Sequence, residues 1–201
     1  MRTKVTLMCA SVLLCGASGC AGLTGVAMTG SICGEERGGS SRWTAPDLVR
    51  TGNSYLENLT DSSPANAMVC YLHTLQINPE DYGAHLGIGV ANIMTARLTG
   101  QKEHLNTART HLALALAIRP FHFETVYYLA ELAVLEEKYT IAKELLTPLL
   151  KAGYKKGPVN TLAGDVYVHL GEEKLARKFY TIGADEGWPM STARYAQERR
   201  Q

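Results

Sequence analysis

The sequence predicts an all-α protein built from repeated helical hairpins, and two observations predict it. From Ala45 onward the apolar residues recur at helical spacing, and the alternating pattern of strands is hard to find. A pattern of small and large residues also occurs twice at an interval of about 34 residues, which is typical of stacked helix pairs. The matching positions are Ala130 and Gly164, Ala142 and Ala176, Leu146 and Tyr180, and Leu149 and Gly183.

The last copy carries a complete set of packing residues. Gly164 is small, Tyr167 is an aromatic residue three positions on, Ala176 is small, and Tyr180 is large. This spacing resembles the tetratricopeptide-repeat (TPR) signature. The resemblance implies a TPR solenoid of about four hairpins, with small residues where two helices cross and large residues between successive hairpins. The preceding copy has the same spacing without the aromatic residue, in Ala130, Ala133, Ala142 and Leu146.

Two earlier copies are longer than the last two. The first has extra residues in a turn at 61–64, and the second has extra residues around 94–103, with the turn expected at 99–101. Pro79 and Pro120 follow the second helix of these hairpins, because proline cannot continue a helix. Their packing residues are Gly52, Tyr55, Ala67 and Tyr71, then Gly87, Ala108, Leu112 and Ala115. The predicted repeats are therefore about 45–79, 80–120, 121–154 and 155–189 within a TPR domain of residues 45–201, with a capping helix at 190–201.

The N-terminus has the pattern of a targeting segment. Arg2 and Lys4 precede an apolar run at residues 5–16, which is typical of a secretory signal peptide. The run leads into residues 17–20, Ala-Ser-Gly-Cys, which resemble a bacterial lipobox. The resemblance implies a lipoprotein signal peptide of residues 1–19 and a diacylglycerol on Cys20, with residues 20–44 as a flexible tether. Ala21 in place of Asp implies an outer membrane lipoprotein that faces the periplasm.

Two alternatives to lipidation remain open. Residues 5–34 carry no charge, so they could span a bilayer as an uncleaved anchor. The chain could also be secreted without a lipid. The cysteines are Cys9, Cys15, Cys20, Cys33 and Cys70, and none makes a C-x-x-C pair, so we expect no zinc site. We expect no disulfide framework either, because the helical region beyond residue 71 contains no cysteine. Cys33 is expected to be a free thiol, although an oxidising periplasm could cross-link it.

The TPR resemblance implies that the concave face, lined by the first helix of each hairpin, binds a peptide or helix of a partner protein. The groove positions carried over to this chain are Asn92, Glu124, Tyr127, Glu131, Leu135, Asp165, Val168 and His169. The sequence departs from the family's carboxylate clamp of Lys, Asn and Arg, because Tyr127, Glu131 and Asp165 occupy the relevant face. We therefore expect a mildly acidic groove that repels a terminal carboxylate and suits a basic or amphipathic partner. Residues 121–123, Phe-His-Phe, are a second candidate surface or, alternatively, a plug for the next hairpin.

Composition and motifs argue against other classes of function. Lys+Arg 20 against Asp+Glu 19 gives a net charge of +1, so nucleic acid is not an expected partner. Among the 6 histidines only His104 and His111 share a helix face, so we expect no metal. No P-loop, Rossmann or nucleophile motif occurs, so we expect no cofactor and no catalytic residue.

The predicted function is that of a lipid-anchored TPR scaffold in the bacterial envelope, not an enzyme. TPR lipoproteins of pilus assembly and secretion are similar in anchor, tether and repeat array, which is an argument from analogy. The alternatives are a periplasmic chaperone for secreted or pilin subunits and a regulator of a cell-wall enzyme. A homodimer is also open, because the last hairpin leaves an apolar end.

Overall fold

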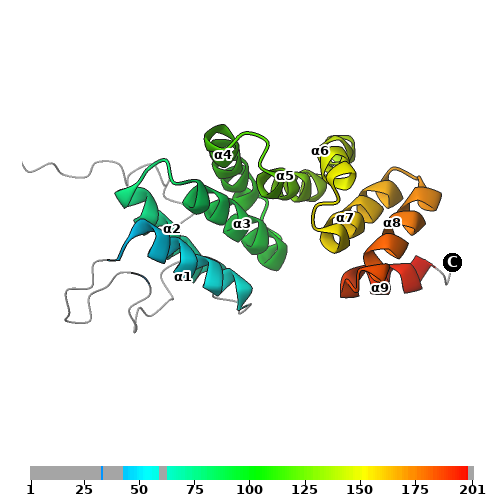
Figure 1. Ribbon diagram of the computed structural model, residues 1–201, viewed down its shortest axis with the longest axis horizontal. Coiled ribbons are helices and arrows are strands. Elements are labelled where there is room, and N and C mark those ends of the chain that lie inside the picture. Colours follow the sequence, from blue (N-terminus) through cyan, green and yellow to red (C-terminus); the bar gives the residue numbers. More distant parts are fainter. Residues whose placement is uncertain (1–32, 34–42, 59–62, 199–201) are drawn as a thin grey trace, which may run out of the picture.

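A computed structural model describes residue 33, residues 43–58 and residues 63–198, and every regular element in these ranges is a helix (Figure 1). The prediction of an all-α fold is confirmed. The predicted signal peptide and the lipidated Cys20 lie outside the described residues. Across the described part of the chain, no helix has both the length and the apolar character that a membrane span requires.

The described residues form nine helices that follow one another along the long axis of the molecule (Figure 1). They pair as hairpins α1–α2, α3–α4, α5–α6 and α7–α8, and α9 packs on both α7 and α8. Their bounds are α1 Ala45–Glu57, α2 Ser63–Ile77, α3 Tyr82–Thr99, α4 Glu103–Ile118, α5 Phe123–Leu135, α6 Tyr139–Ala152, α7 Lys156–His169, α8 Glu173–Asp185 and α9 Pro189–Glu198.

Local signals explain where several helices begin and end. Asp81 caps α3, because its carboxylate accepts a hydrogen bond from the backbone N–H of Ala84 at 2.9 Å. Gly100 ends the same helix in the left-handed region, at φ 71°. The turn predicted near Gly100 is thus confirmed, and the extra residues of this hairpin lengthen α3 and α4 to 18 and 16 residues. Helices α2 and α4 end at Ile77 and Ile118, shortly before the prolines.

Successive hairpins pack mainly through the second helix of one and the first helix of the next, as in α2 with α3, α4 with α5 and α6 with α7. A smaller set of contacts is confined to one side of the array. The odd-numbered helices touch their successors, α1 with α3, α3 with α5, α5 with α7 and α7 with α9. Among the described residues no two even-numbered helices pack on each other. Since neighbouring hairpins lie closer on the odd side, the array curves with the odd-numbered helices on its inner face.

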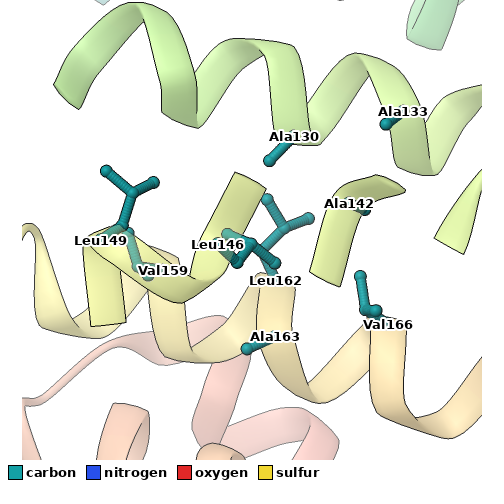
Figure 2. Close-up of a cluster of buried hydrophobic side chains, with 9 residues drawn as sticks. All are labelled: Ala130, Ala133, Ala142, Leu146, Leu149, Val159, Leu162, Ala163 and Val166. Carbon is teal, nitrogen blue, oxygen red and sulfur yellow. The ribbon is translucent and has the colours of Figure 1, made fainter. Parts of the chain in front are cut away.

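The core lies between successive hairpins. In the largest cluster, small residues of α5 such as Ala130 face the leucines of α6 and the valines of α7 (Figure 2). Leu146 and Leu149 fill the space between α5 and α7, and both are buried. A layer of this kind buries apolar surface that no single hairpin could bury alone.

Glycine stands at several positions of the repeat pattern because an aromatic ring occupies the space where a Cβ would lie. Tyr71 is fully buried and lies between Gly52 of α1 and Gly87 of α3, so a Cβ on either glycine would overlap its ring. Tyr180 covers Gly164 in the same way. A tyrosine in α2 therefore joins the first hairpin to the second.

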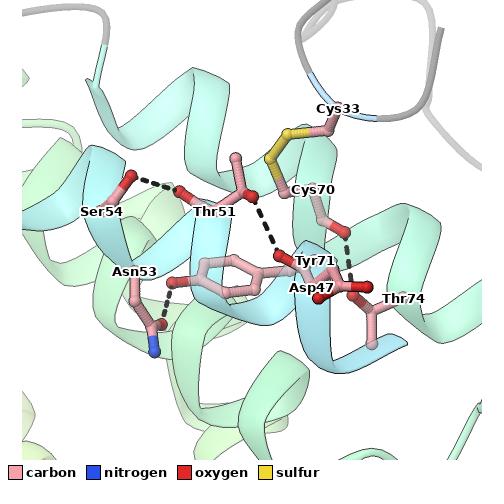
Figure 3. Close-up of a disulfide and its surroundings, with 8 residues drawn as sticks. All are labelled: Cys33, Asp47, Thr51, Asn53, Ser54, Cys70, Tyr71 and Thr74. Carbon is pink, nitrogen blue, oxygen red and sulfur yellow. Dashed lines mark hydrogen bonds between the residues drawn. A yellow bond between two sulfur atoms is a disulfide. The ribbon is translucent and has the colours of Figure 1, made fainter. Parts of the chain in front are cut away.

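Cys33 and Cys70 form a disulfide, with their Cα atoms 5.2 Å apart (Figure 3). The prediction that Cys33 is a free thiol is wrong. Cys70 lies on α2 and packs with Cys33 and Leu48 in a buried cluster. The pairing joins residues 37 positions apart, and this separation gives no sign of it in the sequence.

Candidate partner-binding groove

Two hollows on the inner face of the array bear on the predicted groove. We call the first the C-terminal groove, a hollow of about 440 Å³ lined by α3, α5, α7, α9 and the turn before α9. The second, the N-terminal groove, has a volume of about 370 Å³ and is lined by α1, α3 and α5. Both lie on the odd-numbered helices, where the curvature of the array makes a concave surface.

The structure brings five of the eight predicted groove residues to these hollows. Four of them line the C-terminal groove, and the fifth lines the N-terminal groove. The four are Tyr127, Glu131, Leu135 and Asp165, and the fifth is Glu124.

Asn92 does not face a groove, which corrects the sequence prediction. Its side chain is buried, donates to the carbonyl of Ile88 at 2.8 Å, and lies 3.1 Å from His104 Nδ1. It therefore links α3 to α4. The reason is register: the glycine of α3 that packs against α4 is Gly89, beside Leu112, and not Gly87, which lies beside Tyr71 of the preceding hairpin.

His169 and Val168 are also outside the two grooves. The imidazole of His169 stacks on the ring of Tyr139 in α6, with ring centroids 4.2 Å apart and an angle of 7°. Val168 is part of neither hollow, although its side chain is exposed. Both residues belong to the last turn of α7, beyond the part of that helix that lines the C-terminal groove.

Glu131 is a nearly buried carboxylate held by two donors. The hydroxyl of Tyr127 donates to Glu131 Oε1 at 2.9 Å, and Arg97 Nη2 lies 3.1 Å from the same oxygen. Burial and the adjacent negative charge of Glu131 raise the pKa of Tyr127 far above its ordinary value, so its hydroxyl remains a donor.

Asp165 repeats this arrangement one hairpin later. Tyr180 donates to Asp165 Oδ1 at 2.8 Å, and Arg194 Nε lies 3.3 Å from that oxygen. Glu131 and Asp165 are one repeat period apart, and Arg97 precedes Glu131 by the same interval. Glu131 and Asp165 thus occupy matching positions in α5 and α7, whereas Arg97 lies in the last turn of the longer helix α3.

The expected acidity of the C-terminal groove is corrected by these ion pairs. Its two carboxylates are matched by Arg97 and Arg194, and the arginine side chains are the more exposed partners, at 46% each against 10% for Glu131 and 20% for Asp165. A terminal carboxylate would therefore meet guanidinium groups first. The repeat pattern indicated neither arginine, because Arg97 lies in the extended part of α3 and Arg194 comes from α9, outside the repeats.

The N-terminal groove has a different character. Its charged lining residues are Glu57 and Glu124, and its aromatic ones are Tyr82 and Tyr128. Glu124 is paired with Lys155 at 3.1 Å, and burial raises the pKa of Tyr128 to about 12. This half of the inner face carries the acidic and aromatic surface that the sequence predicted for the whole.

The Phe-His-Phe segment is divided between two roles. Phe123 packs edge-on against Tyr154, with ring centroids 5.6 Å apart, and His122 Nδ1 lies 2.7 Å from the hydroxyl of Tyr82. These two residues fit the predicted plug between hairpins. Phe121 does not, because its side chain is 87% exposed.

The histidines that share a face in the sequence do not meet in space. His104 contacts Asn92, whereas His111 Nδ1 lies 3.0 Å from His85 Nδ1. In the described residues no three His, Cys, Asp or Glu side chains gather as they would around a metal ion.

The sequence matches no protein-family model and no curated protein.

Proposed function

We propose that this protein is a TPR-like scaffold that binds a segment of a partner protein along its inner face. The observation that carries the proposal is the C-terminal groove, which crosses four successive odd-numbered helices and combines apolar walls with fixed charges. Grooves of this kind accept a helix or an extended peptide, whose apolar side chains enter the hollow while polar groups set its register. The regular period of the inner-face residues supports the TPR type.

We further propose that the scaffold is anchored by an acylated Cys20 to the outer membrane, facing the periplasm, and serves the assembly or localisation of a pilus or secretion complex. The signal-like N-terminus and the lipobox pattern support export. The Cys33–Cys70 disulfide supports it independently, because disulfides persist mainly in oxidising compartments. The choice of machine follows the similarity to TPR lipoproteins.

Site-specific photocrosslinking tests the groove. A benzophenone amino acid at Met190, which lines the C-terminal groove and is 56% exposed, should yield one consistent crosslinked partner in the native cells. The matched control is Ile141 on α6, which is 48% exposed and lies outside both grooves. Equal products from both positions, or no product from Met190, would contradict binding in this groove.

Fractionation of the Cys20→Ser variant tests the anchor. Wild type should sediment with the outer membrane and the variant should move to the soluble periplasmic fraction, because the thiol that carries the lipid is absent. An unchanged distribution of the variant would exclude a lipid anchor at Cys20.

A further inference from the structure

We infer that the C-terminal groove selects an acidic segment of its partner, with one Asp or Glu on each side of an apolar residue. This inference deepens the proposed function and depends on it. It reverses the preference for a basic partner that the sequence predicted for this face.

The two exposed cations of the groove stand on opposite walls. Arg97 comes from α3 and Arg194 from α9, the first and last of the four helices that line the groove, and α5 and α7 lie between them. A segment bound along the groove would therefore meet one guanidinium on each side.

Each arginine is paired with a carboxylate of the groove and keeps further N–H donors. Arg97 uses Nη2 for Glu131, and Arg194 uses Nε for Asp165, which is one nitrogen of three in each guanidinium. The remaining N–H groups can bind a carboxylate of a ligand in the forked geometry that guanidinium favours. Because the ion pair already restricts the side chain, binding costs less conformational entropy.

The two carboxylates of the groove favour an acidic ligand over a basic one. Glu131 and Asp165 each accept a tyrosine hydroxyl as well as an arginine, and both are mostly buried. A basic ligand would have to displace the arginines to reach them, which would leave a guanidinium without its partner. An acidic ligand adds a third member to each pair and displaces nothing.

Apolar side chains also line the groove. Val134 and Leu135 come from α5, and Trp188 and Met190 from the start of the α9 segment. An apolar side chain placed between two acidic ones would bury its surface here, at roughly 25 cal/mol per Å². The charges and the apolar lining together specify an acidic–apolar–acidic segment.

Selection from a library of random dodecapeptides tests the inference, with the full-length Cys20→Ser chain as the immobilised protein. The expected pool is enriched in Asp or Glu on both sides of a large apolar residue. The binding of its consensus peptide should fall at least about tenfold in Arg97→Gln/Arg194→Gln, since two charge-assisted hydrogen-bonding groups are lost. Circular dichroism and thermal unfolding of each variant verify that it is folded.

The matched control is Arg109→Gln. Arg109 has the same side-chain exposure of 46% and is paired with Glu136, but it lies outside both grooves. Its substitution should leave peptide binding unchanged. A second variant, Arg97→Lys/Arg194→Lys, keeps the charge and fills the same space, so an intermediate loss of affinity is expected if forked hydrogen bonds contribute.

A basic or neutral pool, or an acidic pool that binds the double Gln variant as well as wild type, would overturn the inference. Crosslinking at Met190 would still stand in either case, so these results leave the proposed function intact. No enriched pool together with no crosslink at Met190 would overturn both. A consensus peptide that binds only with a free C-terminal carboxylate, and not as its amide, would also overturn the internal acidic segment.

Discussion

At the level of single residues, two buried tyrosines supply both apolar packing and a hydrogen bond. Tyr71 and Tyr180 each place a ring against glycine and a hydroxyl on a polar side chain, with Tyr71 donating to Asn53 Oδ1 at 2.7 Å. The ring supplies apolar contact and the hydroxyl stays hydrogen-bonded. No fully buried side-chain nitrogen or oxygen in the described part of the chain lacks a hydrogen-bond partner.

The contact between Gly87 and Tyr71 predicts a destabilising substitution. Gly87→Ala places a Cβ where the Tyr71 ring lies, so we expect a loss of about 1–3 kcal/mol in the free energy of unfolding, measured by urea titration. In a Tyr71→Leu background the ring is gone, and the same substitution should become neutral or stabilising, since alanine favours a helix over glycine by about 1 kcal/mol. An equal loss in both backgrounds would contradict this account of Gly87.

The paired histidines predict a dependence of stability on pH. His85 Nε2 lies 2.9 Å from the carbonyl of Pro79 and must donate to it, so His85 Nδ1 accepts from His111 Nδ1–H when both rings are neutral. Burial lowers the pKa of His111, and the adjacent His85 lowers it further. The unfolded chain then binds more protons than the folded one below the ordinary histidine pKa of about 6.5, so stability should fall as the pH drops below that value.

Urea titrations at about pH 7.5 and about pH 5.5 measure this effect. His111→Asn keeps a donor near His85 and cannot take up a proton, so its unfolding free energy should change less between the two conditions than that of wild type. An identical change in both proteins would show that the histidine pair does not cause the pH dependence.

At the level of elements, the disulfide joins a segment outside the repeats to the first hairpin. Cys33 precedes α1, and Cys70 lies in α2 (Figure 3). If Cys20 carries the lipid as proposed, only the short stretch from Cys20 to Cys33 separates the anchor from this fixed point. The first hairpin would then be held within about 45 Å of the membrane surface, at roughly 3.3–3.6 Å per extended residue.

Removal of the disulfide should destabilise the protein. For a separation of 37 residues, we expect Cys70→Ser to lower the free energy of unfolding by about 3–4 kcal/mol, because the unfolded chain gains the entropy of an open loop. Dithiothreitol should lower the stability of wild type by a similar amount and leave that of Cys70→Ser unchanged. Peptide mapping without reduction checks the pairing, and a free thiol at Cys33 would contradict it.

At the level of the whole molecule, α9 completes the array rather than adding another hairpin. It packs on α7 and α8, and the Ser191 hydroxyl is buried in contact with Thr161 of α7. It also supplies Met190 and Arg194 to the C-terminal groove. One helix therefore covers the open end and forms one wall of the candidate site.

Truncation after Gly187 should loosen the array from one end. Since each hairpin is stabilised mainly by its neighbours, amide hydrogen exchange should accelerate most in α7 and α8, while protection in α1 and α2 stays near its original level. Hydrogen exchange with mass spectrometry measures both ends in one experiment. A uniform loss of protection along the chain would instead indicate a single cooperative unit.

Much of the fold followed from local patterns in the sequence. Helical spacing from Ala45, the prolines after α2 and α4, and the repeat period each depend on short-range chemistry that a sequence displays. The same period placed Glu131 and Asp165 on the inner face. It failed for Asn92, because the glycine of α3 that packs against α4 is Gly89, and not Gly87 as the repeat pattern implied.

The sequence alone determined the helices, their order and the repeated positions of small and large residues, because backbone hydrogen bonds and packing periodicity act over a few turns. Tertiary structure decided the charge of the groove and the pairing of cysteines. Arg194 reaches Asp165 only because α9 packs on α7, and Cys33 meets Cys70 of α2 across a separation of 37 residues. These contacts join residues that no local rule connects, so they depend on how the whole array packs.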